Sequence, residues 1–152
     1  MTDFARARRT MVDNQLRTSG ITDWRILDVM NRVPREVFVP AERKALAYID
    51  ENIRLSATRT MLAPASLARL IQLAEVGPDD KVLDVGCGSG YSTAVLAGLS
   101  ASVVGLEDDP ALVDKANETL TTLGISNAVV AGGSLEAGAA RNGPFDVIII
   151  EG

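Results

Sequence analysis

The residues best suited to chemistry lie in one glycine-rich segment near the middle of the chain. It reads Val82-Leu83-Asp84-Val85-Gly86-Cys87-Gly88-Ser89-Gly90-Tyr91. Three glycines spaced two apart let a backbone turn tightly and come close to a ligand. The apolar residues before this loop predict a buried strand and the residues after it predict a helix. The segment is therefore typical of a cofactor-binding turn.

The spacing of the glycines discriminates between cofactors. A dinucleotide loop follows the pattern G-x-G-x-x-G, whose third glycine lets the helix pack closely on the strand. Tyr91 occupies that position here, which disfavours a nicotinamide dehydrogenase. A second acid, Glu107, ends the next expected strand, 21 positions after Gly86. An open α/β sheet can present such a carboxylate to both hydroxyls of a ribose.

The composition excludes several kinds of chemistry. The 152 residues include no histidine and a single cysteine, so a Ser-His-Asp triad, a histidine base and a histidine-based metal site are excluded, and we expect no metal. Without a histidine partner, Cys87 is interpreted as a packing residue and not as a nucleophile.

The charge is unevenly distributed along the chain. Residues 1–59 hold eleven basic and eight acidic side chains (+3), and residues 60–152 hold four and twelve (−8). No nucleic-acid surface is expected from this balance. The basic residues Arg6, Arg8, Arg9 and Arg17 are interpreted as a solvated helix face, with contact to an acidic partner as the alternative.

No membrane or secretory segment is expected. Residues 85–106 carry no charge and are long enough to span a bilayer, but five glycines and four serines favour a loop, a helix and a strand. The first residues carry charges and lack the apolar stretch of a secretory signal, so we expect a cytoplasmic protein.

The first part of the chain, residues 1–59, is predicted to be a helical region. One helix is expected over residues 4–16 with Gly20 as its stop, and a second begins at the cap Thr22 and ends at Pro34. Residues 36–40 are predicted to be extended. Residues 48–60 give no clear pattern. A further helix is expected from Pro64 to the terminator Gly77-Pro78.

The remaining residues alternate strands with helices. Strands are predicted over residues 82–85, 102–106, 128–131 and 145–150, and helices over residues 92–99 and 110–123, the latter capped by Asp109. This alternation predicts an α/β fold with a parallel sheet flanked by helices. The uninterrupted apolar run of the fourth strand predicts a strand covered on both faces.

Asp84 and the G-x-G-x-G loop resemble motif I of class I S-adenosylmethionine-dependent methyltransferases. The N-terminal region of protein-L-isoaspartate O-methyltransferases resembles four segments of this chain: residues 11–16, 20–23, 26–30 and 33–40. The similarity continues further along the chain, through residues 47–48, 60–64, 94–96 and 144–146. The resemblance implies a Rossmann-like methyltransferase fold. It also implies protein repair, in which a methyl group passes from S-adenosylmethionine to the free carboxylate of an isoaspartyl residue in a damaged protein or peptide, leaving S-adenosylhomocysteine.

The same resemblance implies the cofactor site. In the family, the glycine loop passes along the methionine part of the cofactor and the acid before it helps to hold the amino group. The implied cofactor-binding residues are Asp84, Gly86, Cys87, Gly88, Ser89, Gly90, Glu107, Asp108, Gly133 and Ser134. The reaction suits a chain without histidine, because its nucleophile is a carboxylate that is already ionised at neutral pH.

Two segments depart from the family pattern. On the substrate side, Thr60, Met61 and Leu62 form the loop, and Leu62 occupies the position of the family's active-site serine. After the third strand, Gly133 and Ser134 stand where the family has Asp-Gly, which removes an acid near the adenine. We expect cofactor binding to be retained and isoaspartyl activity to be at risk. The alternatives are a catalytically silent cofactor-binding or interaction protein, or a methyltransferase with another substrate.

The family's sheet has seven strands, and four are expected here. We therefore interpret residues 1–59 as the N-terminal helical region, and residues 60–152 as the cofactor-binding half of a longer sheet whose C-terminal strands are missing. The fourth strand would then be an unpaired apolar edge, through which the chain could self-associate.

Overall fold

The computed structural model describes residues 3–151. Its contacts divide the chain into two compact units, Met1–Glu75 and Val76–Gly152, called here the first and second unit. Helix α3 (Pro64–Ala74) groups with the first unit, whereas the sequence placed the boundary before this helix, after residue 59.

The first unit begins with a continuous but non-uniform helix. Helix α1 (Phe4–Met11) runs into a π-helical turn, η1 (Val12–Leu16), and a 3₁₀ turn, η2 (Arg17–Ser19). The predicted helix over residues 4–16 thus consists of two helix types. Gly20 follows with a φ of 83°, a left-handed conformation that suits glycine and ends the helix as predicted.

Helix α2 (Trp24–Arg32) is capped by Asp23, whose carboxylate accepts a hydrogen bond from the Arg25 backbone N–H. The predicted cap, Thr22, is wrong by one position. The N–H groups of Thr22 and Asp23 both donate to the side-chain oxygen of Gln72, at 3.0 and 3.1 Å, which fixes the chain before the helix. The helix ends before Pro34, as predicted.

The extended segment predicted over residues 36–40 is also wrong. Two 3₁₀ turns occupy this region, η3 (Arg35–Phe38) and η4 (Ala41–Leu46), and only Val39 between them is extended. Arg35 and Glu36 are buried and hydrogen-bonded to residues elsewhere in the first unit. These tertiary contacts override the strand propensity of the neighbouring valines and phenylalanine.

A short antiparallel hairpin follows in the segment without a clear pattern. Strand β1 (Ile53–Arg54) pairs with β2 (Thr60–Met61). Helix α3 then starts at Pro64, as predicted, but it ends at Ala74 with Glu75 in a left-handed conformation. The terminator Gly77-Pro78 therefore lies beyond the actual end of the helix.

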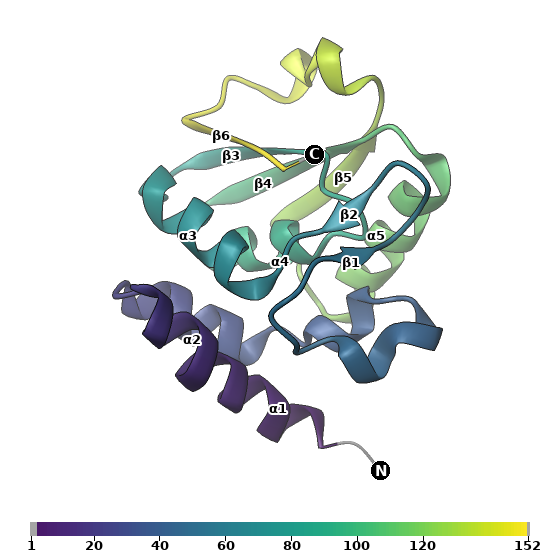
Figure 1. Cartoon of the computed structure of the whole chain (residues 1–152). Coiled ribbons are helices and arrows are strands. Elements are labelled where there is room, and N and C mark those ends of the chain that lie inside the picture. Colours follow the sequence, from purple (N-terminus) through teal and green to yellow (C-terminus); the bar gives the residue numbers. More distant parts are fainter. Residues whose placement is uncertain (1–2, 152) are drawn as a thin grey trace. The chain divides into compact units, whose positions relative to one another are not determined.

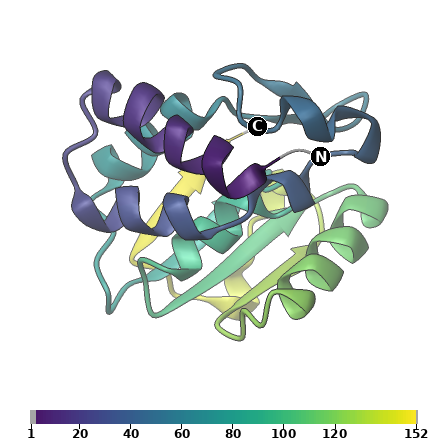
Figure 2. The same cartoon turned by 90° about the horizontal axis from the view of Figure 1, so that it is seen from below.

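The second unit contains a four-stranded parallel sheet in the order β5-β4-β3-β6. The strands are β3 (Lys81–Val85), β4 (Ser102–Glu107), β5 (Ala128–Gly132) and β6 (Val147–Ile150). Helix α4 (Tyr91–Ala97) connects β3 to β4, and α5 (Pro110–Thr122) connects β4 to β5 (Figures 1 and 2). Asp109 caps α5, as predicted. The expected α/β fold with a parallel sheet flanked by helices is confirmed.

The two faces of this sheet are covered differently. Helices α4 and α5 pack on one face, and the connection from β5 to β6 covers the other, where it carries the 3₁₀ turns η5 (Leu135–Ala137) and η6 (Ala140–Asn142) (Figure 1). Strand β6 lies at the edge, with Ile149 buried but Ile148 57% and Ile150 71% exposed. The prediction that this strand is covered on both faces is wrong, because this irregular connection leaves those two side chains exposed.

Candidate functional site

The glycine-rich loop joins the end of β3 to the start of α4. Gly86, Gly88 and Gly90 all adopt left-handed backbone conformations, with φ of 75°, 59° and 95°. Side chains with a Cβ are strained in this region, so the turn requires its alternating glycines. The N–H groups of Gly86 and Cys87 donate to the Leu106 carbonyl at 2.8 and 3.3 Å, which holds the loop against β4.

Asp84 lies fully buried at the base of the loop. One carboxylate oxygen accepts hydrogen bonds from the hydroxyls of Ser92 and Thr93, at 2.6 and 2.9 Å, in the first turn of α4. Its other oxygen has no hydrogen-bond partner among residues 3–151, and neither has the buried Ser89 hydroxyl. Because buried polar atoms are nearly always hydrogen-bonded, these two atoms indicate a place where a polar ligand completes the bonding.

Glu107 is the last residue of β4 and is also fully buried. Its Oε2 accepts a hydrogen bond from the Gly88 N–H at 2.9 Å, and its Oε1 lies 3.4 Å from the Asp109 N–H. Strands β3 and β4 are parallel neighbours, so Asp84 and Glu107 meet at the carboxyl edge of the sheet. Ligands of open α/β sheets bind at this edge.

The other predicted cofactor residues lie at the same edge. Asp108 directly follows Glu107, and Gly133 and Ser134 directly follow β5; all three are exposed. The Gly133 N–H donates to the Glu107 carbonyl at 3.1 Å, which ties the end of β5 to the end of β4. The structure thus brings all ten predicted residues to one end of the second unit.

Sequence reasoning missed three polar residues of this site. Ser92 and Thr93 bind Asp84, and the Ser92 hydroxyl is also within hydrogen-bond distance of the Glu151 carboxylate. Glu151 follows β6, and its N–H donates to the Val85 carbonyl at 3.0 Å. Glu151 could have been predicted from the sequence, because it is an acid that directly follows a strand. Glu107, which was predicted, is likewise an acid at the end of a strand.

The Cys87 thiol is buried within this group of acids. Burial raises the pKa of Cys87, and the negative charges of Asp84, Glu151 and Glu107 raise it further. The thiol therefore stays protonated at neutral pH, in agreement with a packing role. Gly105 on β4 leaves room for it, because a Cβ built on this glycine would lie only 2.8 Å from the Cys87 sulfur.

The predicted substrate-side residues belong to the first unit. Thr60 is exposed, Met61 is buried and Leu62 is half-buried, so Met61 serves the core. The fully buried Arg35 guanidinium donates to the carbonyl oxygens of Leu62 and Ala47, at 2.9 and 2.6 Å. Arg35 therefore fixes the backbone of the loop. Sequence reasoning missed it, because nothing local distinguishes a buried arginine from an exposed one.

Two further side chains hold the residues that follow the loop. Asn52 accepts a hydrogen bond from the Ala63 N–H at 2.8 Å, and Asp50 accepts a longer one from the Ala65 N–H at 3.4 Å. Both come from the segment before β1. Together with Arg35 they fix the end of the substrate-side loop.

Arg8, Tyr48 and Glu36 form a partly buried polar cluster in the same unit. Arg8 donates to the Tyr48 hydroxyl at 2.9 Å and pairs with Glu36 at 3.2 Å, and the Tyr48 hydroxyl donates to the second oxygen of Glu36. Burial raises the pKa of Tyr48, and Glu36 adds to this effect against the opposing influence of Arg8. Arg8 is therefore not part of a solvated basic face, which corrects the interpretation of the N-terminal arginines.

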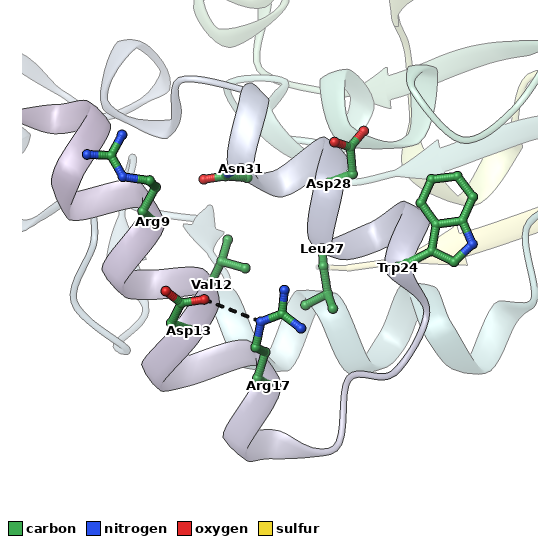
Figure 3. A pocket seen from close by; sticks show the side chains of 8 residues that line it. All are labelled: Arg9, Val12, Asp13, Arg17, Trp24, Leu27, Asp28 and Asn31. Carbon is green, nitrogen blue, oxygen red and sulfur yellow. Dashed lines mark hydrogen bonds and ion pairs between the residues drawn. The ribbon is translucent and has the colours of Figure 1, made fainter.

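A separate groove of about 300 Å³ lies between the α1–η1 helix and α2 (Figure 3). The buried side chains of Val12 and Leu27 face each other across it. Polar and aromatic side chains complete its lining: Arg9, Asp13, Arg17, Trp24, Asp28 and Asn31. None of the predicted site residues belongs to this groove.

Residues 3–151 contain no group of three or more His, Cys, Asp or Glu side chains that could hold a metal ion. No helix in this part of the chain is both long enough and apolar enough to cross a membrane.

Comparison with solved structures supports the fold. A protein-L-isoaspartate O-methyltransferase superposes with a TM-score of 0.82 and 24% identity, covering 93% of this chain and 47% of that one. A precorrin 8w decarboxylase from Methanobacterium thermoautotrophicum matches 58% of this chain, with a TM-score of 0.53 and 26% identity, and 48% of its own length is covered. The chain thus spans less than half of each of these structures.

Comparison of sequences identifies the family. Residues 6–152 match the profile of the protein-L-isoaspartate(D-aspartate) O-methyltransferases. Proteins named protein-L-isoaspartate O-methyltransferase from Koribacter versatilis and Methylorubrum populi are 40% and 41% identical over 150 residues. These alignments cover 99% of this chain and 68% and 69% of the relatives, so the chain spans about two thirds of their length. The chain belongs to the protein-L-isoaspartate(D-aspartate) O-methyltransferase family.

Proposed function

We propose that the second unit binds S-adenosylmethionine and that the chain serves transfer of its methyl group to the free carboxylate of isoaspartyl residues in damaged proteins. The observation that carries the proposal is the polar edge around the left-handed glycine loop. There, a buried oxygen of Asp84 and the buried hydroxyl of Ser89 have no hydrogen-bond partner among residues 3–151. Family membership supplies the class of cofactor.

The residues present fit this cofactor. Asp84 can accept a hydrogen bond from its ammonium group, and Ser89 can donate one to its carboxylate. Glu107 has two carboxylate oxygens, held by the backbone of the glycine loop and of the start of α5, that suit a pair of ribose hydroxyls. Asp108, Gly133 and Ser134 are exposed beside Glu107, where the adenine would lie.

The proposed reaction makes modest demands on the protein. The cofactor supplies an electrophilic methyl group on a sulfonium, and the isoaspartyl carboxylate is ionised at neutral pH and needs no base. The chain's share is to align the two reactants and exclude water, which is consistent with the absence of histidine. We place the reaction in the cytoplasm, where a free thiol such as that of Cys87 stays reduced.

The substrate-side loop offers one hydroxyl for the substrate. Leu62 cannot donate a hydrogen bond, and Met61 is buried. Thr60 is exposed on β2, and we propose that its hydroxyl donates a hydrogen bond to the substrate carboxylate. We expect Leu62→Ser to raise the rate of methyl transfer, because it restores the hydroxyl found in the family.

Two measurements test the proposal together. Calorimetry with S-adenosylhomocysteine and, for comparison, NAD measures the cofactor preference; we expect binding of the former alone. Transfer of a labelled methyl group to an isoaspartyl peptide and to its aspartyl counterpart measures the reaction; we expect labelling of the isoaspartyl peptide alone. Failure to bind S-adenosylhomocysteine would refute the whole proposal.

A silent cofactor-binding protein is the second candidate, favoured by Leu62 and by the loss of the acid at Gly133. It predicts that S-adenosylhomocysteine binds while neither peptide is labelled. A methyltransferase with another substrate predicts the same result for these peptides, together with labelling of other proteins in a cell extract.

We also propose that the edge strand β6 mediates self-association, as the sequence suggests. The exposed Ile148 and Ile150 and the unpaired backbone of this strand support the proposal. Sedimentation should show a concentration-dependent dimer that Ile148→Lys abolishes. A monomer at all concentrations would contradict it.

A further inference from the structure

A pocket of about 420 Å³ lies in the second unit, at the end of the sheet where the parallel strands begin. It is lined by Lys81 and Ser102, the first residues of β3 and β4, and by Ala128, the first residue of β5. Residues 141–143, at the end of η6, also line it. The predicted cofactor residues gather at the opposite, carboxyl ends of these strands, so this pocket is separate from the candidate cofactor site.

The charge of the pocket is opposite to that of its surroundings. The second unit contains eleven acidic side chains and three basic ones. Two of these three, Lys81 and Arg141, line the pocket, and no acid from the described part of the chain does. The nearby carboxylates of Asp80 and Asp146 accept hydrogen bonds from the N–H groups of Gly77 and Lys81, at 2.7 and 2.8 Å. The lining therefore has an excess of positive charge, which favours an anionic ligand.

The ring of Phe145 lies between the sheet and the turn that carries Arg141. The Lys81 ammonium lies over this ring, 5.6 Å from its centroid. Gly143 lies against the same ring, because a Cβ built on it would be 3.4 Å from two ring carbons. Neither Lys81 nor Arg141 forms an ion pair with any residue between 3 and 151. Both positive charges can therefore bind an anion in the pocket.

Neutral hydrogen-bond donors accompany the two bases. The hydroxyls of Ser102 and Ser126 and the side-chain amide of Asn142 line the pocket, and none of them has a hydrogen-bond partner within the described residues. The Asn127 amide, in contrast, already donates to the Ala97 carbonyl at 2.8 Å. A phosphate group carries up to two negative charges on three acceptor oxygens, whereas a carboxylate carries one on two. The two bases and three neutral donors therefore suit a phosphate group better.

An apolar surface lies in the same pocket. Val129 of β5 is 48% exposed and lines the pocket with the buried Val103 and Val104. An organic group attached to the phosphate would remove this valine from water, which is favourable. We propose that the pocket binds a small phosphomonoester, with its phosphate on Lys81 and Arg141 and its organic group on Val129. This site is independent of the proposed methyl transfer and of its cofactor.

Phenyl phosphate is the probe, because it joins a phosphate to an apolar ring; inorganic phosphate and phenol are its separate parts. Titrations at about pH 7.5, where a phosphomonoester is mostly a dianion, are followed by the backbone amide signals in NMR. We expect phenyl phosphate to shift the signals of Ser102, Ala128 and Gly143 but not those of Gly86 and Gly88. It should bind at least about tenfold more tightly than phenol, and more weakly at high salt.

The same titration distinguishes two sources of the phosphate group. Inorganic phosphate should shift the same signals but bind more weakly than phenyl phosphate, because it lacks the ring that covers Val129. Equal affinity for the two would overturn the phosphomonoester and assign the pocket to free phosphate. Absence of binding by phenyl phosphate, or equal affinity for phenol, would overturn the site altogether.

Matched variants locate the binding. Lys81→Gln and Arg141→Gln should each weaken phenyl phosphate binding about two- to fivefold, as expected for partly exposed ion pairs. Arg141 is exposed on a short turn, so its replacement leaves the fold intact, which urea denaturation verifies. Lys115→Gln removes an exposed base on α5, outside the pocket, and should change nothing. An equal effect of Arg141→Gln and Lys115→Gln would contradict the proposal.

Discussion

The two units build their polar sites in different ways. In the second unit, the centre of the site is one local segment: a loop of alternating glycines, the strand before it and the first turn of the helix after it. Glu107 and Glu151 join it from the ends of two other strands. In the first unit, charged side chains reach across the chain, as Arg8 does to Tyr48, 40 positions away, and Arg35 to Leu62, 27 positions away. A site centred on a local segment can be recognised in a sequence, whereas contacts of buried arginines with distant residues cannot.

The largest expected effect concerns Arg35. Arg35→Met keeps an unbranched apolar stem but removes the guanidinium group, which leaves the buried carbonyl groups of Leu62 and Ala47 without their donor. We expect the free energy of unfolding to fall by about 3 kcal/mol. Urea denaturation measures it, with the exposed Arg32→Met as the control. A loss no larger than that of the control would show that the first unit does not depend on its distant contacts.

Glu107→Ala tests the local site of the second unit. We expect binding of S-adenosylhomocysteine to weaken by about 1–3 kcal/mol, because charge-assisted hydrogen bonds are lost. Calorimetry measures the change, and Glu118→Ala, an exposed acid on α5, is the control. Unchanged affinity would remove Glu107 from the cofactor site.

Helix α2 allows the sequence and the structure to be compared at one helix end. Asp23→Ala removes the observed cap and should cost about 1 kcal/mol of folding stability, whereas Thr22→Ala should cost only a few tenths. Thermal unfolding of the two variants decides between them. A larger loss for Thr22→Ala would restore the cap that the sequence predicted.

The smallest effect is a change in pH dependence. The pKa of Tyr48 is raised in the folded chain, so folding favours its protonated form. The associated stability is present below the ordinary tyrosine pKa of about 10 and is lost as the pH rises above it. Tyr48→Phe should therefore lose stability less steeply than the unmodified chain above about pH 10 in urea denaturation. Parallel curves would show that burial in the folded chain does not raise this pKa.

The sequence predicted the fold of the second unit well because its signals are local. Each strand is a short apolar run, Asp109 caps its helix through its own side chain, and the glycines occupy the left-handed positions of the loop. The predictions failed where distant contacts compete with local preference. Residues 36–40 have the composition of a strand but form a 3₁₀ turn, because Arg35 and Glu36 are held by Ala47, Leu62, Arg8 and Tyr48.

The candidate site also has residues that could be predicted from the sequence and residues that could not. Asp84, Glu107 and the glycine loop could be predicted, because alternating strands and helices indicate a parallel sheet, and acids at the carboxyl ends of parallel strands meet at one edge. Ser92, Thr93 and Glu151 were missed, although they lie at the same edge. The hydroxyl groups of Ser92 and Thr93 gain meaning only from their contact with Asp84, whereas Glu151 could have been predicted as an acid that directly follows a strand.

By itself, the sequence determined the class of fold, the alternating glycines of the loop between β3 and α4, and the absence of histidine chemistry, because each depends on residue type and short-range spacing. The tertiary structure alone decided three further features. It placed Arg35 behind the substrate-side loop, it turned Arg8 inward to Glu36, and it left Trp24 exposed beside an apolar groove. The physical reason is burial: the same arginine or tryptophan is a surface residue or a structural one according to what the folded chain places around it.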